Sequence, residues 1–251
     1  MQDTNPFQWP RGKQAAVSLT FDDARLSQID VGIPLLNQFG VKGTFFASPA
    51  EMLQRLDGWR AALRAGHEVG NHTVNHPCTG NFCWSRQHAL EEYTLDQMAA
   101  ELDYANAQIE KHLGIRPKSF AYPCGQTFVG AGVNTRSYVP FVAERFIVGR
   151  GYPNETPNDP LRCDLAQAMG IDLDNKPIAE IQRLIEQTKT RGGWIIFAGH
   201  EMGQAQGQSV SAASLTALCR YLTEANDLWV DTTANIGAYI AATRRKSGLT
   251  A

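Results

Sequence analysis

Short apolar runs alternate along this chain with longer stretches of helical periodicity, and that alternation constrains the fold more than any other feature. Residues 15–21 have the pattern of a buried strand, and residues 29–39 then carry apolar side chains at helical spacing before Gly40. The same order of strand and helix recurs to the end of the sequence. Strands that alternate with helices pair in parallel, because each helix returns the chain to the start of the next strand.

Seven segments are predicted to be strands of one parallel sheet. Their ranges are 15–21, 43–47, 68–70, 119–122, 146–149, 194–199 and 228–232. The helices predicted between them span 29–39, 59–65, 94–113, 140–145, 178–191 and 211–226. An open doubly wound sheet is the alternative, but no G-x-G-x-x-G motif follows a strand. We therefore expect an α/β fold, a deformed (β/α) barrel of about seven or eight parallel strands, as a single domain over residues 1–251.

The composition excludes several classes of partner. The 23 Lys and Arg residues nearly balance the 25 Asp and Glu residues, which gives a formal net charge of −2. No block of like charges marks a surface for nucleic acid. No apolar run approaches the ~20 residues that a membrane-spanning helix needs. We expect neither a nucleic-acid partner nor a membrane span, and nothing in the sequence indicates an oligomeric state.

The cysteines bear on the compartment of the protein. The chain has five, and Cys78 and Cys83 are close enough in sequence for a local disulfide, at a spacing that fits no zinc knuckle. A disulfide there would favour an oxidising compartment. Residues 1–6 carry no leader pattern, so two interpretations stay open. The chain is either cytoplasmic or exported with its leader removed, and export is slightly favoured.

Acidic and imidazole side chains follow two of the predicted strands. Asp22 and Asp23 come directly after the first strand, and His72 and His76 follow the third. The histidines are four positions apart, a spacing that places both on one face of a helical turn. With Asp23 they would form a two-histidine, one-carboxylate metal site that leaves positions open for water and substrate. The alternatives are a helix-capping pair of aspartates and two structural histidines.

Five segments, in order, resemble the motifs of the polysaccharide deacetylases, also called carbohydrate esterase family 4. They are TFDD at 20–23, KGTFF at 42–46, GHEVGNHTVNHP at 66–77, FAYPCG at 120–125 and IIFAGH at 195–200. The third segment is highly specific, and the resemblance covers roughly residues 15–202. It implies a deformed barrel and a metal-dependent hydrolase that removes acetyl groups from N-acetylated sugars or, in some members, from O-acetylated xylan.

The resemblance also implies a role for each residue of the site. The metal ligands would be Asp23, His72 and His76. The metal would be a divalent ion, zinc in most members and cobalt or nickel in others. Asp22 would act as general base and His200 as general acid. The backbone N–H of Cys124 would stabilise the oxyanion, so the side chain at that position is free to vary.

The partner of the general base departs from the family pattern. Many members carry an arginine in the motif at 120–125 that pairs with the base, and here that position holds Ala121. An arginine from another loop is expected to replace it. Arg162 is the first candidate, ahead of Arg25 and Arg150.

Two further departures concern His200 and its surroundings. The acid that orients the general acid through its other ring nitrogen is expected to be Asp164 or Asp172. Ala198 stands where many members have a leucine, which would widen the acetyl pocket or leave an aromatic side chain to fill it.

Aromatic residues near the site are candidates for contact with a sugar. Phe82 and Trp84 lie on the loop that follows His76, where they would either stack on a sugar ring or pack the loop down. Tyr122 is a further candidate for lining the substrate. The remaining histidines are expected to be structural: His67, His88 and His112.

The function predicted from these residues is the removal of acetyl groups from a carbohydrate, with the N-acetyl groups of an amino-sugar glycan as the first expectation. The alternatives are an O-acetylxylan esterase, a cyclic-amide hydrolase and a non-catalytic glycan-binding relative. Relatives with cyclic-amide activity tend to lose one metal residue, whereas this chain keeps Asp23, His72 and His76. The missing arginine of the motif at 120–125 is what keeps the non-catalytic alternative open.

Overall fold

The structure is a computed structural model that describes residues 7–203 and 206–248. At its centre, seven parallel strands run side by side in the order β7-β4-β3-β2-β1-β9-β8. Their bounds are Ala15–Phe21 (β1), Gly43–Ala47 (β2), Glu68–Asn71 (β3), Ser119–Ala121 (β4), Val148–Arg150 (β7), Gly170–Asp172 (β8) and Trp194–Gly199 (β9). A parallel bridge between Arg150 and Ala168 joins the two edges, so the sheet is a nearly closed barrel.

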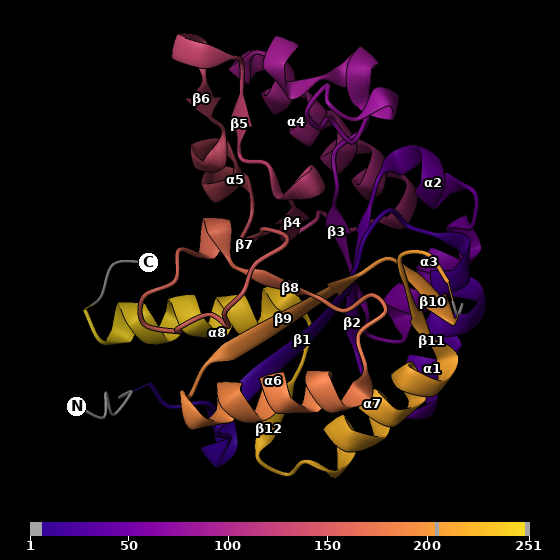
Figure 1. The fold of residues 1–251 in the computed structure, drawn as a ribbon, viewed down its shortest axis with the longest axis vertical. Helices are drawn as coiled ribbons and strands as arrows, with labels where there is room; N and C mark the ends of the chain where they lie inside the picture. Colours follow the sequence, from indigo (N-terminus) through magenta and orange to yellow (C-terminus); the bar gives the residue numbers. More distant parts are fainter. Residues whose placement is uncertain (1–6, 204–205, 249–251) are drawn as a thin grey trace.

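The order of strands around the barrel is also their order along the chain, and helices form a layer outside them (Figure 1). The helices are α1 (Ile33–Gln38), α2 (Pro49–Leu53), α3 (Leu56–Arg64), α4 (Leu95–Leu113), α5 (Val139–Arg145), α6 (Ile178–Thr190), α7 (Ala212–Glu224) and α8 (Thr233–Lys246). Two small sheets pair β5 (Phe128–Val129) with β6 (Arg136–Ser137) and β10 (Glu201–Gly203) with β11 (Ser209–Ser211). Both follow the carboxyl ends of barrel strands.

Strands β1 and β9 are adjacent, fully buried strands of the barrel wall. Every residue of both strands is buried, and they pair with each other along six positions. Leu19 and Phe197 belong to the same apolar core, and the buried hydroxyl of Thr20 donates to the carbonyl of Phe197 at 2.8 Å. Because Asp22 and His200 directly follow these strands, their backbone positions are fixed by the core.

Helix α4 begins and ends where its sequence signals predict. The Thr94 hydroxyl accepts from the backbone N–H of Gln97, whose side chain in turn accepts from the backbone N–H of Thr94, a capping box. Gly114 ends the helix in the left-handed conformation at φ 72°. The helix packs against β3, so its inner face is directed at the loop that follows that strand.

The barrel expected from the sequence is confirmed, with differences in its parts. The segment at 146–149 forms strand β7 two residues later, and β8 was not predicted. The segment at 228–232 forms β12 (Leu228–Val230), which pairs with β1 outside the ring of seven. It lies beside the first half of β1, because β2 occupies the same edge of β1 from Leu19 onward.

Three helical segments also differ from expectation. The segment at 29–39 is divided into a π-helix, Gln28–Gly32, and α1, with Pro34 at the junction. Proline has no N–H to donate to the preceding turn, so a continuous α-helix cannot run through it undisturbed. Helix α8, which packs against β1 and β7, was not predicted, and neither was the short helix α2.

Within the described parts of the chain, no helix combines the length and the apolar character needed to cross a bilayer.

Candidate metal and catalytic site

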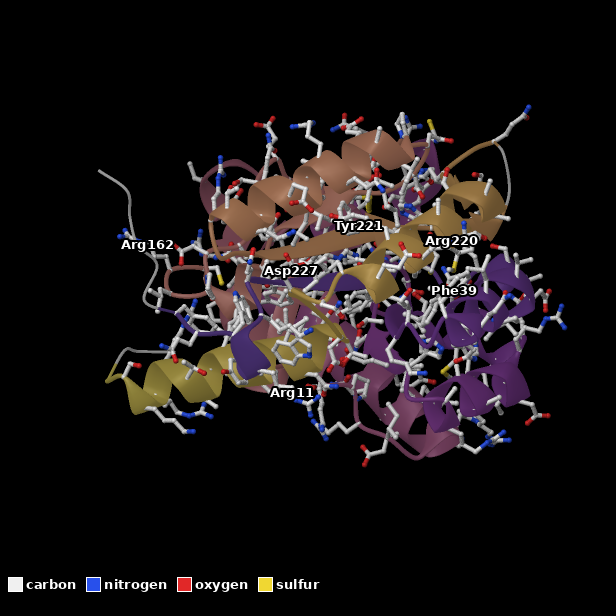
Figure 2. All side chains as sticks on the ribbon, turned by 90° about the horizontal axis from the view of Figure 1, so that it is seen from below. Arg11, Phe39, Arg162, Arg220, Tyr221 and Asp227 are labelled. Atoms are coloured by element: carbon white, nitrogen blue, oxygen red, sulfur yellow. A yellow bond between two sulfur atoms is a disulfide. The ribbon has the colours of Figure 1, made fainter. Side chains whose placement is uncertain are left out.

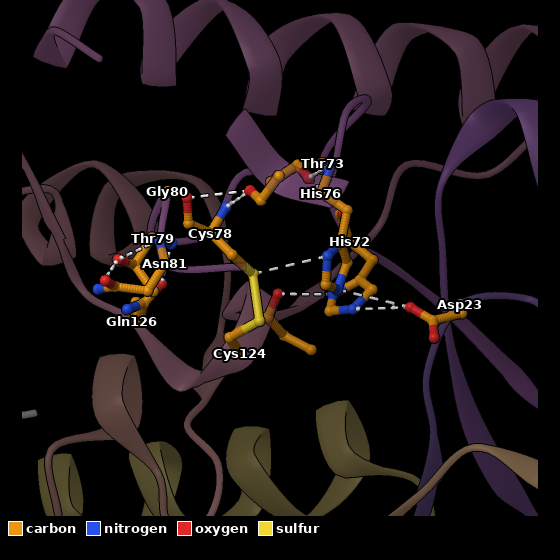
Figure 3. Close-up of a disulfide and its surroundings, with 12 residues drawn as sticks. Asp23, His72, Thr73, His76, Cys78, Thr79, Gly80, Asn81, Cys124 and Gln126 are labelled. Atoms are coloured by element: carbon orange, nitrogen blue, oxygen red, sulfur yellow. Dashed lines mark hydrogen bonds and ion pairs between the residues drawn. A yellow bond between two sulfur atoms is a disulfide. The ribbon is translucent and has the colours of Figure 1, made fainter. Parts of the chain in front are cut away.

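Three side chains from the ends of two strands meet at the carboxyl end of the barrel. Asp23 follows β1, and His72 and His76 lie in the loop after β3. The Nε2 atoms of His72 and His76 lie 3.4 and 3.5 Å from Oδ1 of Asp23. Donor atoms of all three residues lie within 4.8 Å of one another, close enough to share one ion (Figure 3).

Hydrogen bonds orient these donors for a cation. Nδ1 of His72 lies 2.9 Å from the carbonyl of Ala121, which only a protonated Nδ1 can bond, so the lone pair of Nε2 faces Asp23. Arg25 donates to Oδ2 of Asp23 at 2.9 Å, so Oδ1 of the same carboxylate is left to face the two imidazoles. Burial lowers the pKa of His76 to about 4, which keeps this imidazole neutral. Two neutral imidazoles and a carboxylate are a donor set that fits zinc.

The loop that carries the histidines is not helical, so the expected helical turn is wrong. Thr73 and His76 have positive φ angles of 63° and 48°, which bend the chain sharply between the two histidines. Glu101 of α4 accepts from the backbone N–H groups of Val74 and Asn75 at 2.8 and 3.0 Å. A neighbouring helix therefore sets the spacing of the imidazoles, and sequence spacing alone gave no sign of Glu101.

Backbone strain is concentrated at this end of the barrel. Outside glycine, positive φ angles in the described residues include 71° at Asp23, 50° at Ala24, 63° at Thr73, 48° at His76 and 51° at Cys124. Such conformations cost energy for residues with a Cβ and persist where the surroundings impose them, often at functional sites. The loops after β1, β3 and β4 thus hold five of the seven non-glycine positive φ angles in the described residues, and Arg11 and Asn175 have the other two.

Asp22 is buried and pairs with Arg150, not with Arg162. Nη2 of Arg150 lies 2.5 Å from both carboxylate oxygens of Asp22, and the guanidinium is fully buried over the ring of Phe46. Arg162 instead lies at the edge of the molecule (Figure 2), where it is 79% exposed and pairs with Asp159. The expected replacement of the family arginine is therefore found, but it comes from the end of β7.

His200 is oriented by Asp174, so the two predicted orienting acids are wrong. Oδ2 of Asp174 lies 2.6 Å from Nδ1 of His200, and its Oδ1 accepts from the backbone N–H of His200. Burial lowers the pKa of His200, but the hydrogen bond and the nearby carboxylates outweigh it and raise the pKa. Asp164 caps the turn Leu165–Gln167, and Asp172 accepts from the hydroxyl of Tyr152.

Two residues that the sequence did not single out help to place Asp22, His200 and Asp174. The side-chain amide of Gln28 donates to the backbone carbonyls of both Asp22 and His200, at 2.6 and 2.9 Å. Gly199 lets Asp174 approach, because a Cβ at that position would lie 3.1 Å from Oδ1 of Asp174. Neither role leaves a local pattern in the sequence.

Cys124 lies beside the donor set and is bonded to Cys78, so the expected Cys78–Cys83 disulfide is wrong. Cys83 is an exposed free cysteine at the start of a 3-10 helix. The Cys78–Cys124 bond joins the loop after β3 to the loop after β4, 46 positions later, and passes beside His76 (Figure 3).

The aromatic candidates divide into two groups. Tyr122 is only 1% exposed, and its hydroxyl donates to the carbonyl of Ala166 at 2.7 Å, so it belongs to the core and does not line the site. Phe82 and Trp84 are 43% and 60% exposed and stack with ring centroids 5.3 Å apart. Trp84 also lies 5.6 Å from the ring of His76, which places this pair at the rim of the donor set.

The arrangement brings together the groups that hydrolysis of an acyl bond requires. One end of the (β/α) barrel holds three such groups. They are the three-donor set for a cation, the carboxylate of Asp22 beside Arg150, and the imidazole of His200 beside Asp174. The charges of Asp22 and Asp23 contribute to the raised pKa of His200, so the three groups are within electrostatic reach of one another. Barrels with this class of site activate water and protonate a leaving group.

The comparison with protein families identifies this class. The sequence model of the family described as polysaccharide deacetylase matches residues 10–136, just over half of the 251 residues. The chain belongs to the polysaccharide deacetylase family.

Two relatives that the chain matches are named for different polymers. The chain is 28% identical over 107 residues to chitin deacetylase 1 of Cryptococcus neoformans and 36% identical over 62 residues to the peptidoglycan-N-acetylglucosamine deacetylase PgdA of Listeria monocytogenes. These stretches are 43% and 24% of this chain. They cover only 20% and 13% of the two relatives. The chain is also 32% identical to a stretch of the Bacillus subtilis protein YlxY, and this stretch is 26% of that protein.

Solved structures share the fold over nearly the whole chain. A polysaccharide deacetylase structure from Mycobacterium smegmatis superposes with a TM-score of 0.68 at 18% identity, covering 98% of this chain and 95% of the other. The Puue allantoinase superposes with a TM-score of 0.68 at 15% identity, covering 96% of this chain and 95% of the other. A family 4 acetyl xylan esterase from Clostridium thermocellum, solved with a cobalt ion, gives 0.58 at 18% identity, over 93% and 92%.

Proposed function

We propose that this chain is a metal-dependent hydrolase that removes N-acetyl groups from an amino-sugar glycan. The observation that carries the proposal is the meeting of five side chains at one end of the barrel: Asp22, Asp23, His72, His76 and His200. Family membership supports the reaction class, and the named relatives act on chitin and on peptidoglycan N-acetylglucosamine.

Asp23, His72 and His76 would hold the divalent ion, with zinc as the best fit to two imidazoles and a carboxylate and cobalt or nickel as alternatives. When bound there, such an ion would polarise the acetyl carbonyl and lower the pKa of water. The hydrogen bond from His72 to Ala121 and the arginine on Oδ2 of Asp23 support this role, because both direct the free lone pairs to one point.

The residues around the donor set would move the protons. Asp22 accepts a proton from the attacking water, and Arg150 holds its carboxylate in place. His200 donates a proton from Nε2 to the leaving group, since its Nδ1 is bonded to Asp174. The backbone N–H of Cys124, held in an unusual conformation with φ 51°, would donate to the oxyanion of the tetrahedral intermediate.

The pair of His200 and Asp174 favours an amide over an ester as the substrate. An amine leaves poorly unless it is protonated, whereas an alkoxide leaves with less help. Asp174 raises the pKa of His200 and thereby keeps its acidic form available near neutral pH. A site that served only esters would gain less from this pair.

Phe82 and Trp84 support a glycan as the substrate. Two stacked, exposed aromatic rings at the rim of the donor set offer a flat apolar surface of the kind that packs on sugar rings. We expect Trp84→Ala to raise KM for a glycan severalfold with little change in kcat. Trp229→Ala, in the aromatic cluster around Trp9, is the control for loss of a tryptophan far from the rim.

The direct test is acetate release from N-acetylglucosamine oligomers by the metal-loaded protein. We expect release that a chelator abolishes and that falls by a factor of about 100 to 10,000 in Asp22→Asn, because the general base is lost. No release from N-acetylated oligomers of several lengths, with metal restored, would contradict the proposal.

An O-acetyl ester of xylan is the second candidate substrate, because the same residues suffice for an ester. The variant His200→Ala separates the two. It should reduce amide cleavage far more than cleavage of a small acetyl ester. Equal loss on both substrates, with the ester cleaved faster by the unmodified enzyme, would favour the esterase. The cyclic-amide and non-catalytic alternatives predict no acetate at all.

A further inference from the structure

Two cysteines lie directly beside the candidate metal site. Cys78 is two residues after His76 and fully buried, and Cys124 stands on the neighbouring turn Pro123–Gly125. Their disulfide joins the two loops with a Cα separation of 6.2 Å (Figure 3). The bond therefore lies between the loop that carries two candidate metal ligands and the loop that carries the candidate oxyanion donor.

His76 faces donors on both sides of its ring. Its Nε2 lies 3.5 Å from Oδ1 of Asp23, and its Nδ1 lies 3.7 Å from Sγ of Cys78. Donor atoms of His76, Cys78 and Cys124 lie within 4.8 Å of one another, as those of Asp23, His72 and His76 do. The structure thus contains two overlapping sets of three donors that share one imidazole.

We propose that reduction of the Cys78–Cys124 disulfide creates a second metal site, formed by the two sulfur atoms and Nδ1 of His76, for a thiophilic divalent cation such as zinc, cobalt or cadmium. A dithiol reductant supplies two electrons and two protons, is itself oxidised to a disulfide and leaves two thiols. Binding of the cation then releases the two thiol protons.

The present geometry is close to that of such a site. With Zn–S near 2.3 Å and Zn–N near 2.0 Å, tetrahedral angles place the nitrogen and sulfur about 3.5 Å apart. The observed separation of 3.7 Å between Nδ1 of His76 and Sγ of Cys78 already matches this distance. The two sulfur atoms separate once their bond is broken, and soft thiolates select zinc-like ions over calcium or magnesium.

The shared imidazole makes the two sites compete. A neutral imidazole has one lone-pair nitrogen, so His76 serves the Asp23 set through Nε2 or the cysteine set through Nδ1, but not both at once. In the disulfide form Nε2 is free for the first set. Reduction with metal present would therefore withdraw a ligand from the first set and lower deacetylation, a consequence that rests on the proposed function.

Cobalt provides a readout that does not depend on activity. The full chain with Cys83→Ser, which removes the exposed free thiol, is titrated with Co2+ in the oxidised form and after anaerobic reduction with a dithiol and its removal. We expect thiolate-to-cobalt charge-transfer absorption only in the reduced protein. Adding Cys124→Ser should weaken this Co2+ binding at least tenfold, whereas adding Cys163→Ser should leave it unchanged, because Cys163 contacts Arg244 away from the cluster.

Three results would overturn the inference. One is reduced protein, saturated with Co2+, that shows the spectrum of the oxidised protein. Another is a charge-transfer band that keeps its strength in Cys124→Ser. The third is loss of Co2+ binding on reduction without any thiolate band, which would mean that the disulfide only holds the loops together. Failure of the proposed function would appear separately, as oxidised protein that binds metal and releases no acetate.

Discussion

Nη2 of Arg150 lies 2.5 Å from both carboxylate oxygens of Asp22, although 128 positions separate the two residues. The guanidinium is fully buried and packs between the rings of Phe46 and Tyr152. An arginine thus reaches the candidate base from the end of β7, although the position in the motif at 120–125 where many family members carry it holds Ala121. This pair removes the main reason for reading the chain as a non-catalytic relative.

Replacing Arg150 should cost both stability and activity. Arg150→Met leaves Asp22 as a buried carboxylate without its cation, and breaking a buried pair in this way costs about 3–5 kcal/mol. Chemical denaturation measures the change, and acetate release should fall at least tenfold. The exposed Arg162 provides the control, since Arg162→Met should change neither quantity. The double variant Asp22→Asn with Arg150→Met should recover much of the stability and none of the activity. If Arg150→Met is fully active and stable, Arg150 is not the residue that holds Asp22 in place.

Glu101 should control metal affinity without being a ligand. Its carboxylate accepts from the backbone N–H groups of Val74 and Asn75, between the two histidines. Glu101→Gln loses the charge of these hydrogen bonds, so we expect the affinity for zinc to fall about 10- to 100-fold, as for other partners of metal ligands. Competition with a chromogenic chelator measures it. Glu110→Gln, on the exposed side of α4, should bind zinc as the unmodified chain does, and equal affinities in both variants would argue against this role.

Asp174 should set the basic limb of the pH profile. It raises the pKa of His200, and the acidic form of His200 is the one that protonates the leaving group. Asp174→Asn lowers that pKa. As the pH is raised, amide cleavage by this variant should therefore begin to decline at a lower pH than cleavage by the unmodified enzyme. The profile of kcat against pH measures this shift. Asp164→Asn, which affects only a turn, should leave the profile in place; if both variants shift it equally, Asp174 is not the orienting residue.

His67 should make the fold sensitive to acid. Burial and the charge of Lys42 lower its pKa from 6.5 to about 4, and its Nδ1 accepts the backbone N–H of Gly43 at 3.1 Å. A histidine whose folded-state pKa is depressed stabilises the fold above pH 6.5, and this contribution is lost as the pH falls from 6.5 toward 4.

The loss amounts to about 3 kcal/mol of the free energy of unfolding over that interval. Urea unfolding at several pH values measures it. His67→Gln should be less stable at neutral pH and show a flatter dependence below pH 6.5. His112→Gln, on a half-exposed helix position, should follow the unmodified protein. An equal pH slope in the His67 and His112 variants would show that other groups cause the acid sensitivity.

The sequence predicted those parts of the molecule whose signals are local. Residues 15–21, 43–47 and 194–199 match their strands because a buried parallel strand is a continuous apolar run with polar residues at its end. Asp23, His72 and His76 were grouped correctly because each directly follows such a strand or lies near its end. The conformation of the loop that carries His72 and His76 was predicted wrongly. A helical turn and a strained loop can both hold two histidines that are four positions apart.

The partners of the site residues depend on tertiary structure and left no such signal. Asp174 is 26 positions from His200, and Cys124 is 46 positions from Cys78. Each pair forms because strand ends converge at one end of the barrel, which no periodicity encodes. Sequence proximity favoured Cys83 as the partner of Cys78 and was wrong for this reason.

Binding of one catalytic divalent ion by Asp23, His72 and His76 is tested most directly by stripping the oxidised protein of metal and titrating zinc back. Acetate release from an N-acetylglucosamine oligomer is measured during the titration. We predict that release is absent from the stripped protein, that it rises linearly and levels off at one zinc per chain, and that His76→Ala binds zinc far more weakly. Full release by the stripped protein, or none at saturating zinc, cobalt or nickel, would contradict the account.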